Sequence, residues 1–149
     1  MSDVPSPAPD SLTLRFVNDP AVVERVLSAF VEAAERHGYS KASRFAVRLA
    51  LQEGIVNAFK HGHRNLPADA TVEAHYDVSP AEIRLWIHDS GPGFDPRSLP
   101  DPTLDENLET PSGRGIMLMR AYMSRVTFNA QGNRVEMVYA KPKAPAGVA

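Results

Sequence analysis

The hydrophobic pattern of the chain predicts alternating groups of helices and strands. Apolar residues recur at steps of three and four, as in a helix with one buried face, over three segments: 20–37, 41–61 and 115–123. Apolar and polar residues alternate, as in half-buried strands, over five segments: 12–16, 72–78, 83–88, 125–130 and 134–140. Because regular βαβ alternation is missing, this order predicts an α+β two-layer sandwich. We expect the helices on one face of a mixed, largely antiparallel sheet.

Local signals mark where two of the helices begin and end. Asp19 stands before Pro20, which suits a helix N-cap followed by proline at the first helical position. Gly38 is a plausible stop for this helix, and Ser40 can cap the next one. We therefore expect two helices that follow each other closely.

The pattern predicts one domain over residues 11–141. Residues 1–10 contain three prolines and few apolar residues, so we expect a disordered or extended leader, and we expect residues 142–149 to form a loose tail.

Residues 89–112 show no periodicity. Five of the 13 prolines of the chain fall in this stretch: Pro92, Pro96, Pro100, Pro102 and Pro111. A loop of this length inside a small domain is typically functional.

Composition excludes several kinds of chemistry. Without cysteine the chain has no disulfide framework, no iron–sulfur cluster and no thiolate zinc site. The 16 basic and 18 acidic residues are mixed along the chain and give a net charge of −2, so nucleic acid is not an expected partner. No apolar run could span a membrane, and we expect a cytoplasmic location.

Glycine pairs stand at both ends of the long loop, in Asp89-Ser90-Gly91-Pro92-Gly93-Phe94 and in Ser112-Gly113-Arg114-Gly115. Neither pair fits the dinucleotide or P-loop fingerprints. The second pair opens a helix, where backbone N–H groups and the guanidinium of Arg114 could hold a phosphate. Asp89 could accept a hydrogen bond from the amino group of adenine. The alternative is that these are turn glycines, with a solvated arginine and an Asp89 that caps a turn.

The second predicted helix carries a polar stripe. Glu53, Asn57 and His61 are spaced by four residues, with Lys60 beside them. If this stripe faces inward, it must meet a metal ion, a phosphate chain or a water. The amide oxygen of Asn57 suits Mg²⁺, and Glu53 is placed to act as a general base. The alternative is the solvated face of an amphipathic helix. Zinc at His61 and His63 is not expected, because no third ligand has a recognisable spacing.

Together, three motifs resemble those of the gyrase/histidine-kinase/mismatch-repair (GHKL) ATPase superfamily, in the same order. They are the N-box at 53–62, the first glycine box at 89–94 and the second glycine box at 113–116. Within the superfamily the single-domain layout looks most like the anti-sigma factor serine/threonine protein kinases of bacteria. The resemblance implies the Bergerat-type ATP-binding fold over about 12–140, with ATP between the second helix and a lid at about 89–112.

The resemblance also implies a role for each motif residue. Asn57 would bind Mg²⁺, Glu53 would be the general base, and Asp89 would hold the adenine amino group. Further contacts to the nucleotide are expected from the other motif positions: Lys60, His61, Gly91, Gly93, Gly113, Arg114 and Gly115.

The implied activity is transfer of the ATP γ-phosphoryl group to a serine or threonine of a small antagonist protein. Kinases of this kind also bind a sigma factor, regulate it by partner switching and typically form homodimers. Two alternatives stay open, namely a non-catalytic switch that binds ATP and a partner, and a stand-alone small ATPase. Trp86 would be consistent with a dimer or partner surface if it lies on the outer face of the sheet.

Overall fold

The computed structural model describes residues 9–62, 70–89, 111–130 and 133–142, without the side chains of 61, 62 and 111–116. In chain order its elements are β1 (Ser11–Phe16), α1 (Pro20–Arg36), α2 (Lys41–Asn57), the π-helical segment η1 (Ala58–Gly62), β2 (Val72–Val78), β3 (Glu82–Asp89), α4 (Pro111–Tyr122), β4 (Arg125–Phe128) and β5 (Arg134–Ala140). The strands form one sheet in the order β1-β2-β3-β5-β4. All four neighbouring pairs are antiparallel.

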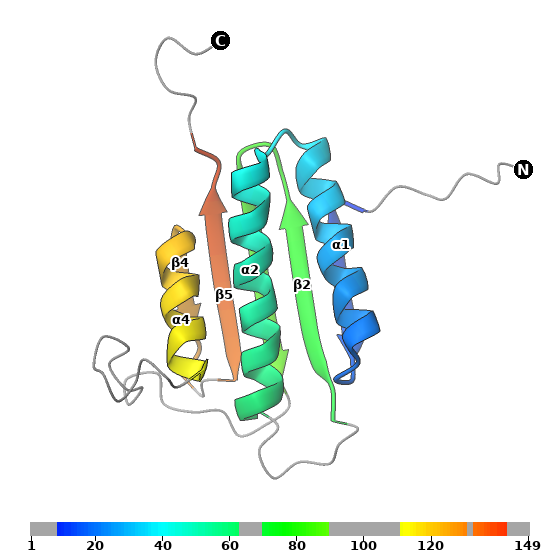
Figure 1. Cartoon of the computed structure of the whole chain (residues 1–149), viewed down its shortest axis with the longest axis vertical. Coiled ribbons are helices and arrows are strands. Elements are labelled where there is room, and N and C mark those ends of the chain that lie inside the picture. Colours follow the sequence, from blue (N-terminus) through cyan, green and yellow to red (C-terminus); the bar gives the residue numbers. More distant parts are fainter. Residues whose placement is uncertain (1–8, 63–69, 90–110, 131–132, 143–149) are drawn as a thin grey trace, which may run out of the picture.

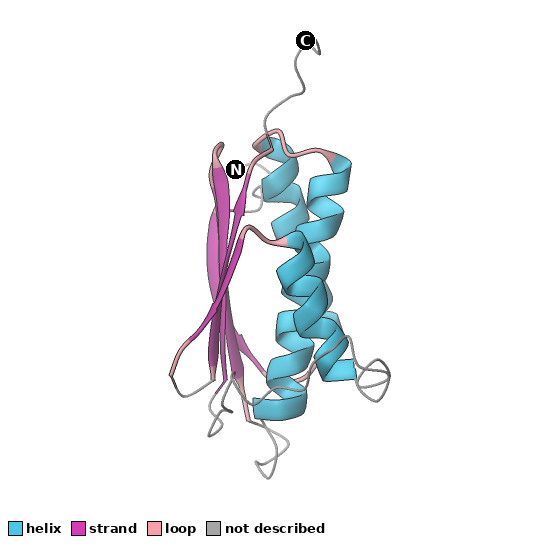
Figure 2. Cartoon of the chain, turned by 90° about the vertical axis from the view of Figure 1, so that its left-hand side faces the viewer, coloured by secondary structure: helices cyan, strands magenta, loops and turns pink. Residues whose placement is uncertain are grey.

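The helices form one layer and the sheet the other. In Figure 1 the helices α4, α2 and α1 stand side by side in front of the sheet, and Figure 2 shows that they cover one face. The side chains that alternate toward the helices from β2 and β3 are buried: Val72, Ala74, Tyr76, Val78, Ile83, Leu85 and Ile87. The predicted two-layer α+β class is confirmed. The described sheet is antiparallel throughout, whereas we expected some parallel pairing.

The helix caps follow the sequence signals. The side chain of Asp19 accepts a hydrogen bond from the N–H of Ala21 at 2.9 Å, with Pro20 at the first helical position. Gly38 stands just beyond α1 with φ of 82°, a left-handed conformation that glycine adopts at little cost. Ser40 caps α2 by accepting from the N–H of Ser43 at 3.1 Å. Among the described residues no helix is both long and apolar enough to cross a membrane.

Three element boundaries differ from the prediction by more than one residue. The α-helical part of α2 ends at Asn57, and the next five residues form η1, in which the backbone turn is wider. Helix α4 begins at Pro111 rather than 115, because proline in the first helical turn loses no helical hydrogen bond. Pro111 therefore belongs to α4 and not to the long loop. Strand β4 ends at Phe128, two residues early, because Asn129 closes a turn with Asn133.

The uncovered face of the sheet carries a stack of side chains around Trp86. The ring of His75 lies parallel to Trp86 at 5.2 Å, and the guanidinium carbon of Arg134 lies 4.4 Å from the Trp86 ring centroid. Desolvation in this stack lowers the pKa of His75 below its ordinary value of 6.5. Trp86 thus lies on the outer face of the sheet, a placement that the sequence left open, with His75 on β2 and Glu136 on β5 as its register neighbours.

A cluster of charged side chains anchors the start of the domain to α1. Asp10 forms an ion pair with Arg36 at the end of α1, and Nε2 of His37 lies 3.0 Å from the same carboxylate oxygen. The hydrogen bond from Arg36, together with the neighbouring His37, lowers the pKa of Asp10 below its ordinary value of 3.8. The ionised form of Asp10 is therefore the one that the folded state favours.

We expect Asp10→Asn to lower the melting temperature at pH 7 by no more than about 3 °C, because the pair is exposed to solvent. Because folding lowers this pKa, the stabilisation is present above pH 3.8 and is lost as the pH falls through the lower folded-state value. The difference between wild type and variant should therefore vanish in acid, which thermal melts between pH 2 and 7 would measure. The exposed Asp77 provides the matched control, Asp77→Asn. A difference that persists at pH 2 would contradict the ion-pair explanation.

Candidate functional site

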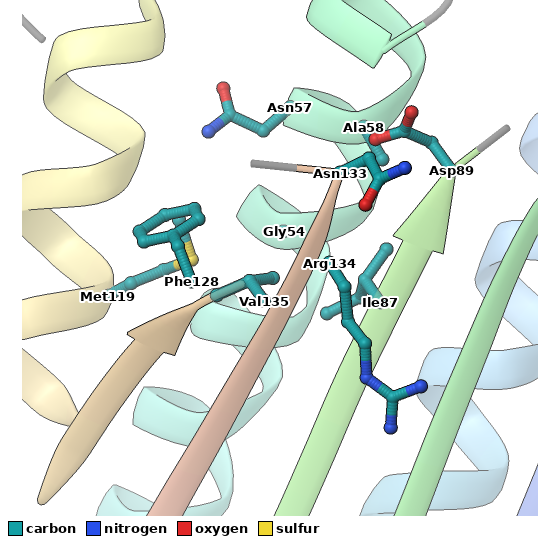
Figure 3. A pocket seen from close by; sticks show the side chains of 10 residues that line it. All are labelled: Gly54, Asn57, Ala58, Ile87, Asp89, Met119, Phe128, Asn133, Arg134 and Val135. Atoms are coloured by element: carbon teal, nitrogen blue, oxygen red, sulfur yellow. The ribbon is translucent and has the colours of Figure 1, made fainter. Parts of the chain in front are cut away.

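The candidate site lies where several elements end. Figure 1 shows the C-terminal end of α2, the first turn of α4, the end of β3 and the start of β5 at the same end of the sandwich. A cavity of about 20 Å³ lies there, with room for about one water molecule. The residues in Figure 3 form its wall: Gly54, Asn57, Ala58, Ile87, Asp89, Met119, Phe128, Asn133, Arg134 and Val135. A larger ligand must therefore displace a side chain of this wall or extend through its opening.

Gly54 allows α2 to lie close to the sheet at this cavity. A Cβ atom at this position would lie 2.7 Å from Cδ1 of Ile87 and 3.4 Å from Cε of Met137. Glycine in a helix interior costs about 1 kcal/mol relative to alanine. The close approach to Ile87 explains why glycine stands in the middle of α2 in spite of that cost.

Asp89 places a buried carboxylate at the cavity. It is the last residue of β3 and is 7% exposed. Its backbone N–H donates to the carbonyl oxygen of Asn133 at 2.9 Å, which holds the end of β3 against the start of β5. A buried carboxylate is stable when hydrogen-bond donors meet it, and Asp89 has an interaction partner in the structure.

The hairpin between β4 and β5 provides the opposite part of the wall. Oδ1 of Asn129 accepts from the backbone N–H groups of Asn133 at 3.0 Å and Arg134 at 3.2 Å. Nδ2 of Asn129 donates to Oδ1 of Asn133 at 2.7 Å. These bonds fix the two carboxamides relative to the hairpin and bring Asn133 beside Asp89 (Figure 3).

The polar stripe of α2 is only partly directed at the cavity. Asn57 is half-buried and forms part of the cavity wall. Glu53, one helical turn earlier, is also half-buried but does not line the cavity. Lys60 is exposed and lines a separate groove between α1 and α2, together with Pro20 and Val56. Because α2 changes to a π-helix after Asn57, the four-residue spacing that aligned His61 with Asn57 no longer applies.

The remaining predicted positions are described in part or not at all. Gly91 and Gly93 lie outside the described residues. Gly113, Arg114 and Gly115 belong to the first turns of α4, so the second glycine motif does open a helix, although the placement of its side chains is outside the description. The structure therefore brings Asn57 and Asp89 to one cavity and leaves the contribution of the glycine motifs as a prediction.

Sequence reasoning missed most of the apolar wall. Met119 is 0% exposed and lines the cavity. Asn133, just before β5, lines it as well. One signal was available, because a glycine inside a helical pattern such as Gly54 usually has a packing reason. The contacts of Phe128 and Asn133 with the cavity depend on the register of β5 against β3, which local periodicity does not reveal.

A cavity with a buried carboxylate and an amide lies at one end of an antiparallel sheet covered by helices, so the chain is an α+β domain with a candidate site at that end. The family model of the histidine kinase-like ATPase domain matches residues 16–139. The chain therefore belongs to this family, and it is an ATP-binding, kinase-like ATPase domain of the GHKL type. The predicted superfamily is thus confirmed. No curated protein matches the chain.

Proposed function

We propose that the chain is an anti-sigma-factor-type serine/threonine protein kinase that binds ATP with Mg²⁺ and phosphorylates a small antagonist protein. One observation carries this proposal: Asp89 and Asn57 line the same cavity, and Glu53 lies one helical turn from Asn57. Asp89 would accept a hydrogen bond from the adenine amino group, while Asn57 and Glu53 of α2 would serve the phosphates of ATP. Separate residues of one site would thus recognise the base and carry out catalysis.

The residues of the site fit a magnesium ion that also binds the nucleotide phosphates. The amide oxygen of Asn57 is a hard ligand, and Mg²⁺ in such sites takes one or two protein ligands, with phosphate oxygens and waters completing the octahedron. Among the described residues no group of three or more acidic, histidine or cysteine side chains could form a metal site without the phosphates. The ion, when bound, would neutralise charge on the β- and γ-phosphates.

In the proposed reaction Glu53 takes the proton of the acceptor hydroxyl. The hydroxyl oxygen forms a bond to the γ-phosphorus, the bond from this phosphorus to the bridging oxygen breaks, and ADP leaves. Positioning by the sandwich and charge neutralisation supply most of the acceleration. The half-buried position of Glu53 keeps its carboxylate within reach of solvent and of an incoming protein.

The proposal extends to partners. The kinase would hold a sigma factor inactive and release it when the antagonist binds, and it would act as a homodimer. The uncovered sheet face around Trp86 is available for one of these contacts.

The test uses the full chain, calorimetric titration with ATP and Mg²⁺, and γ-labelled ATP in the presence of candidate antagonist proteins. Saturable ATP binding with label on a serine or threonine of one antagonist supports the kinase. ATP binding that changes partner association without labelled product would favour the non-catalytic switch instead. Phosphate release without an acceptor would favour the stand-alone ATPase, and absence of ATP binding would rule out all three.

A further inference from the structure

We propose that the outward face of α2 binds an acidic amphipathic helix of the protein that accepts the phosphoryl group. The inference rests on the proposed kinase activity and names the surface that brings the acceptor protein to the site. In Figure 1, α2 stands in the middle of the helical layer, between α1 and α4 and in front of the sheet. Its outward face is the side turned away from the sheet.

Helix α2 carries apolar residues on two faces. The members of one face are buried: Val47, Ala50, Leu51, Gly54 and Ile55. The members of the other face, which we call the seam, follow one another at alternating steps of three and four residues: Ala42, Phe45, Leu49, Gln52 and Val56. The core of the domain explains the first face and leaves the second without a function.

The seam is open to solvent. Phe45 is 64% exposed, the highest value among the large hydrophobic residues that the structure describes, and Val56 is 41% exposed. Ala42 is exposed as well, while Leu49 and Gln52 are half-buried. A single exposed apolar side chain is ordinary, but a continuous row of them along one helix is typical of a protein-binding surface.

The spacing of the seam indicates the shape of its partner. Alternating steps of three and four residues are the repeat by which two helices pack side by side with interlocking side chains. Near Val56 the seam borders a groove of about 450 Å³ between α1 and α2, which Pro20, Val23 and Gln52 also line. A partner helix can therefore place one large apolar side chain in the groove and lay the others along the seam.

The charges at both ends of the seam are positive. Lys41 stands one helical turn before Phe45, Lys60 lines the groove at the other end, and both are exposed. In the middle, Arg48 is already paired with Glu24 of α1 at 3.0 Å. A second copy packed antiparallel about a two-fold axis would place the Lys41 end of one protomer against the Lys60 end of its partner, where like charges repel. A helix with glutamate or aspartate beside its apolar residues is attracted instead.

The position of the seam links it to the proposed reaction. Glu53 is a surface neighbour of Leu49 and Val56 on α2, at spacings of four and three residues. A protein bound along the seam therefore brings its adjoining segments to the proposed general base. No residue of the seam lines the cavity, so acceptor binding and ATP binding use separate residues.

The first test measures binding of the full chain to a fluorescent synthetic helix of about three heptads, with leucine along its apolar stripe and glutamate beside it. A second peptide carries lysine in place of each glutamate. By fluorescence anisotropy we expect saturable binding of the glutamate peptide, at least about threefold tighter than that of the lysine peptide. Lys41→Glu should reduce this preference by about two- to fivefold.

Phe45→Ala should weaken binding of the glutamate peptide by at least about tenfold, because an aromatic anchor contributes much of the affinity of an interface. The matched control is Leu14→Ala, because Leu14 of β1 is 37% exposed but lies outside the seam. It should bind the peptide as wild type does. Because Phe45 is exposed, its variant should melt within about 2 °C of wild type, which a thermal melt checks.

The second test measures phosphoryl transfer to the antagonist protein that accepts the label. Phe45→Ala should raise KM for this protein by about tenfold and leave kcat and ATP affinity unchanged, the signature of lost partner binding. An unchanged KM would show that the acceptor protein docks elsewhere and would overturn the inference.

The outcomes separate the inference from the proposed function. If the glutamate peptide does not bind, or binds Phe45→Ala as tightly as wild type, the inference is overturned, while ATP binding and transfer stand on their own measurements. If wild type binds this peptide through the seam but does not bind ATP, the proposed function is overturned and the seam stands as a helix-binding surface. A dimer in sedimentation equilibrium that dissociates in Phe45→Ala would assign the seam to a second copy and overturn the inference.

Discussion

Replacement of Glu53 by glutamine is expected to lower phosphoryl transfer by about 10²- to 10⁴-fold. ATP affinity should change by less than about threefold, because Glu53 does not line the cavity that we propose as the base site. Glutamine keeps the size of the side chain but cannot accept the proton of the attacking hydroxyl at neutral pH. The effect therefore separates a general base from a residue that holds the nucleotide.

The measurement for Glu53→Gln is the steady-state rate of γ-phosphoryl transfer, to the antagonist or to water, beside calorimetric ATP binding. Glu35→Gln is the control, because Glu35 is an exposed glutamate on α1. The rate of this control should equal that of wild type. Unaltered transfer by Glu53→Gln would show that another group removes the proton, and the role of Glu53 would then be wrong.

The parts of the fold that could be predicted are those that local sequence determines. Alternation along β2 and β3 reports directly which side chains face the helices, because strand side chains alternate between the two faces. The caps at Asp19 and Ser40 are likewise local, since each side chain binds an N–H two or three residues away. Element order and class followed from these signals alone.

The parts that could not be predicted depend on contacts between distant segments. The cavity wall combines Gly54 of α2, Met119 of α4 and Asn133 before β5, which are joined by the strand order β3-β5-β4. No periodicity shows that β5 inserts between β3 and β4. The change to a π-helix after Asn57 was also missed, since a spacing of four suits a continuous α-helix and carries no sign of a wider turn.

Gly54→Ala is expected to weaken ATP binding by about 5- to 150-fold, which corresponds to about 1–3 kcal/mol for an extra methyl group in a packed site. The new Cβ would lie 2.7 Å from Cδ1 of Ile87, so this methyl must rotate away from α2. Ile87 lines the cavity, and its displaced methyl group occupies space in a volume of about 20 Å³. The base would then lose its proposed place between α2 and β3.

The stability of the domain should change much less than its affinity for ATP. Alanine gains about 1 kcal/mol over glycine in the interior of α2, which offsets part of the cost of overpacking. Calorimetry with ATP and Mg²⁺, beside a thermal melt, measures both quantities. Ile87→Val removes Cδ1, so the double variant Gly54→Ala with Ile87→Val should recover most of the ATP affinity, with Ile87→Val alone as the reference. The double variant lacks Cδ1 of Ile87, so the predicted collision cannot occur in it. If it nevertheless binds ATP as weakly as Gly54→Ala, the collision with Ile87 is not the reason why the site needs Gly54.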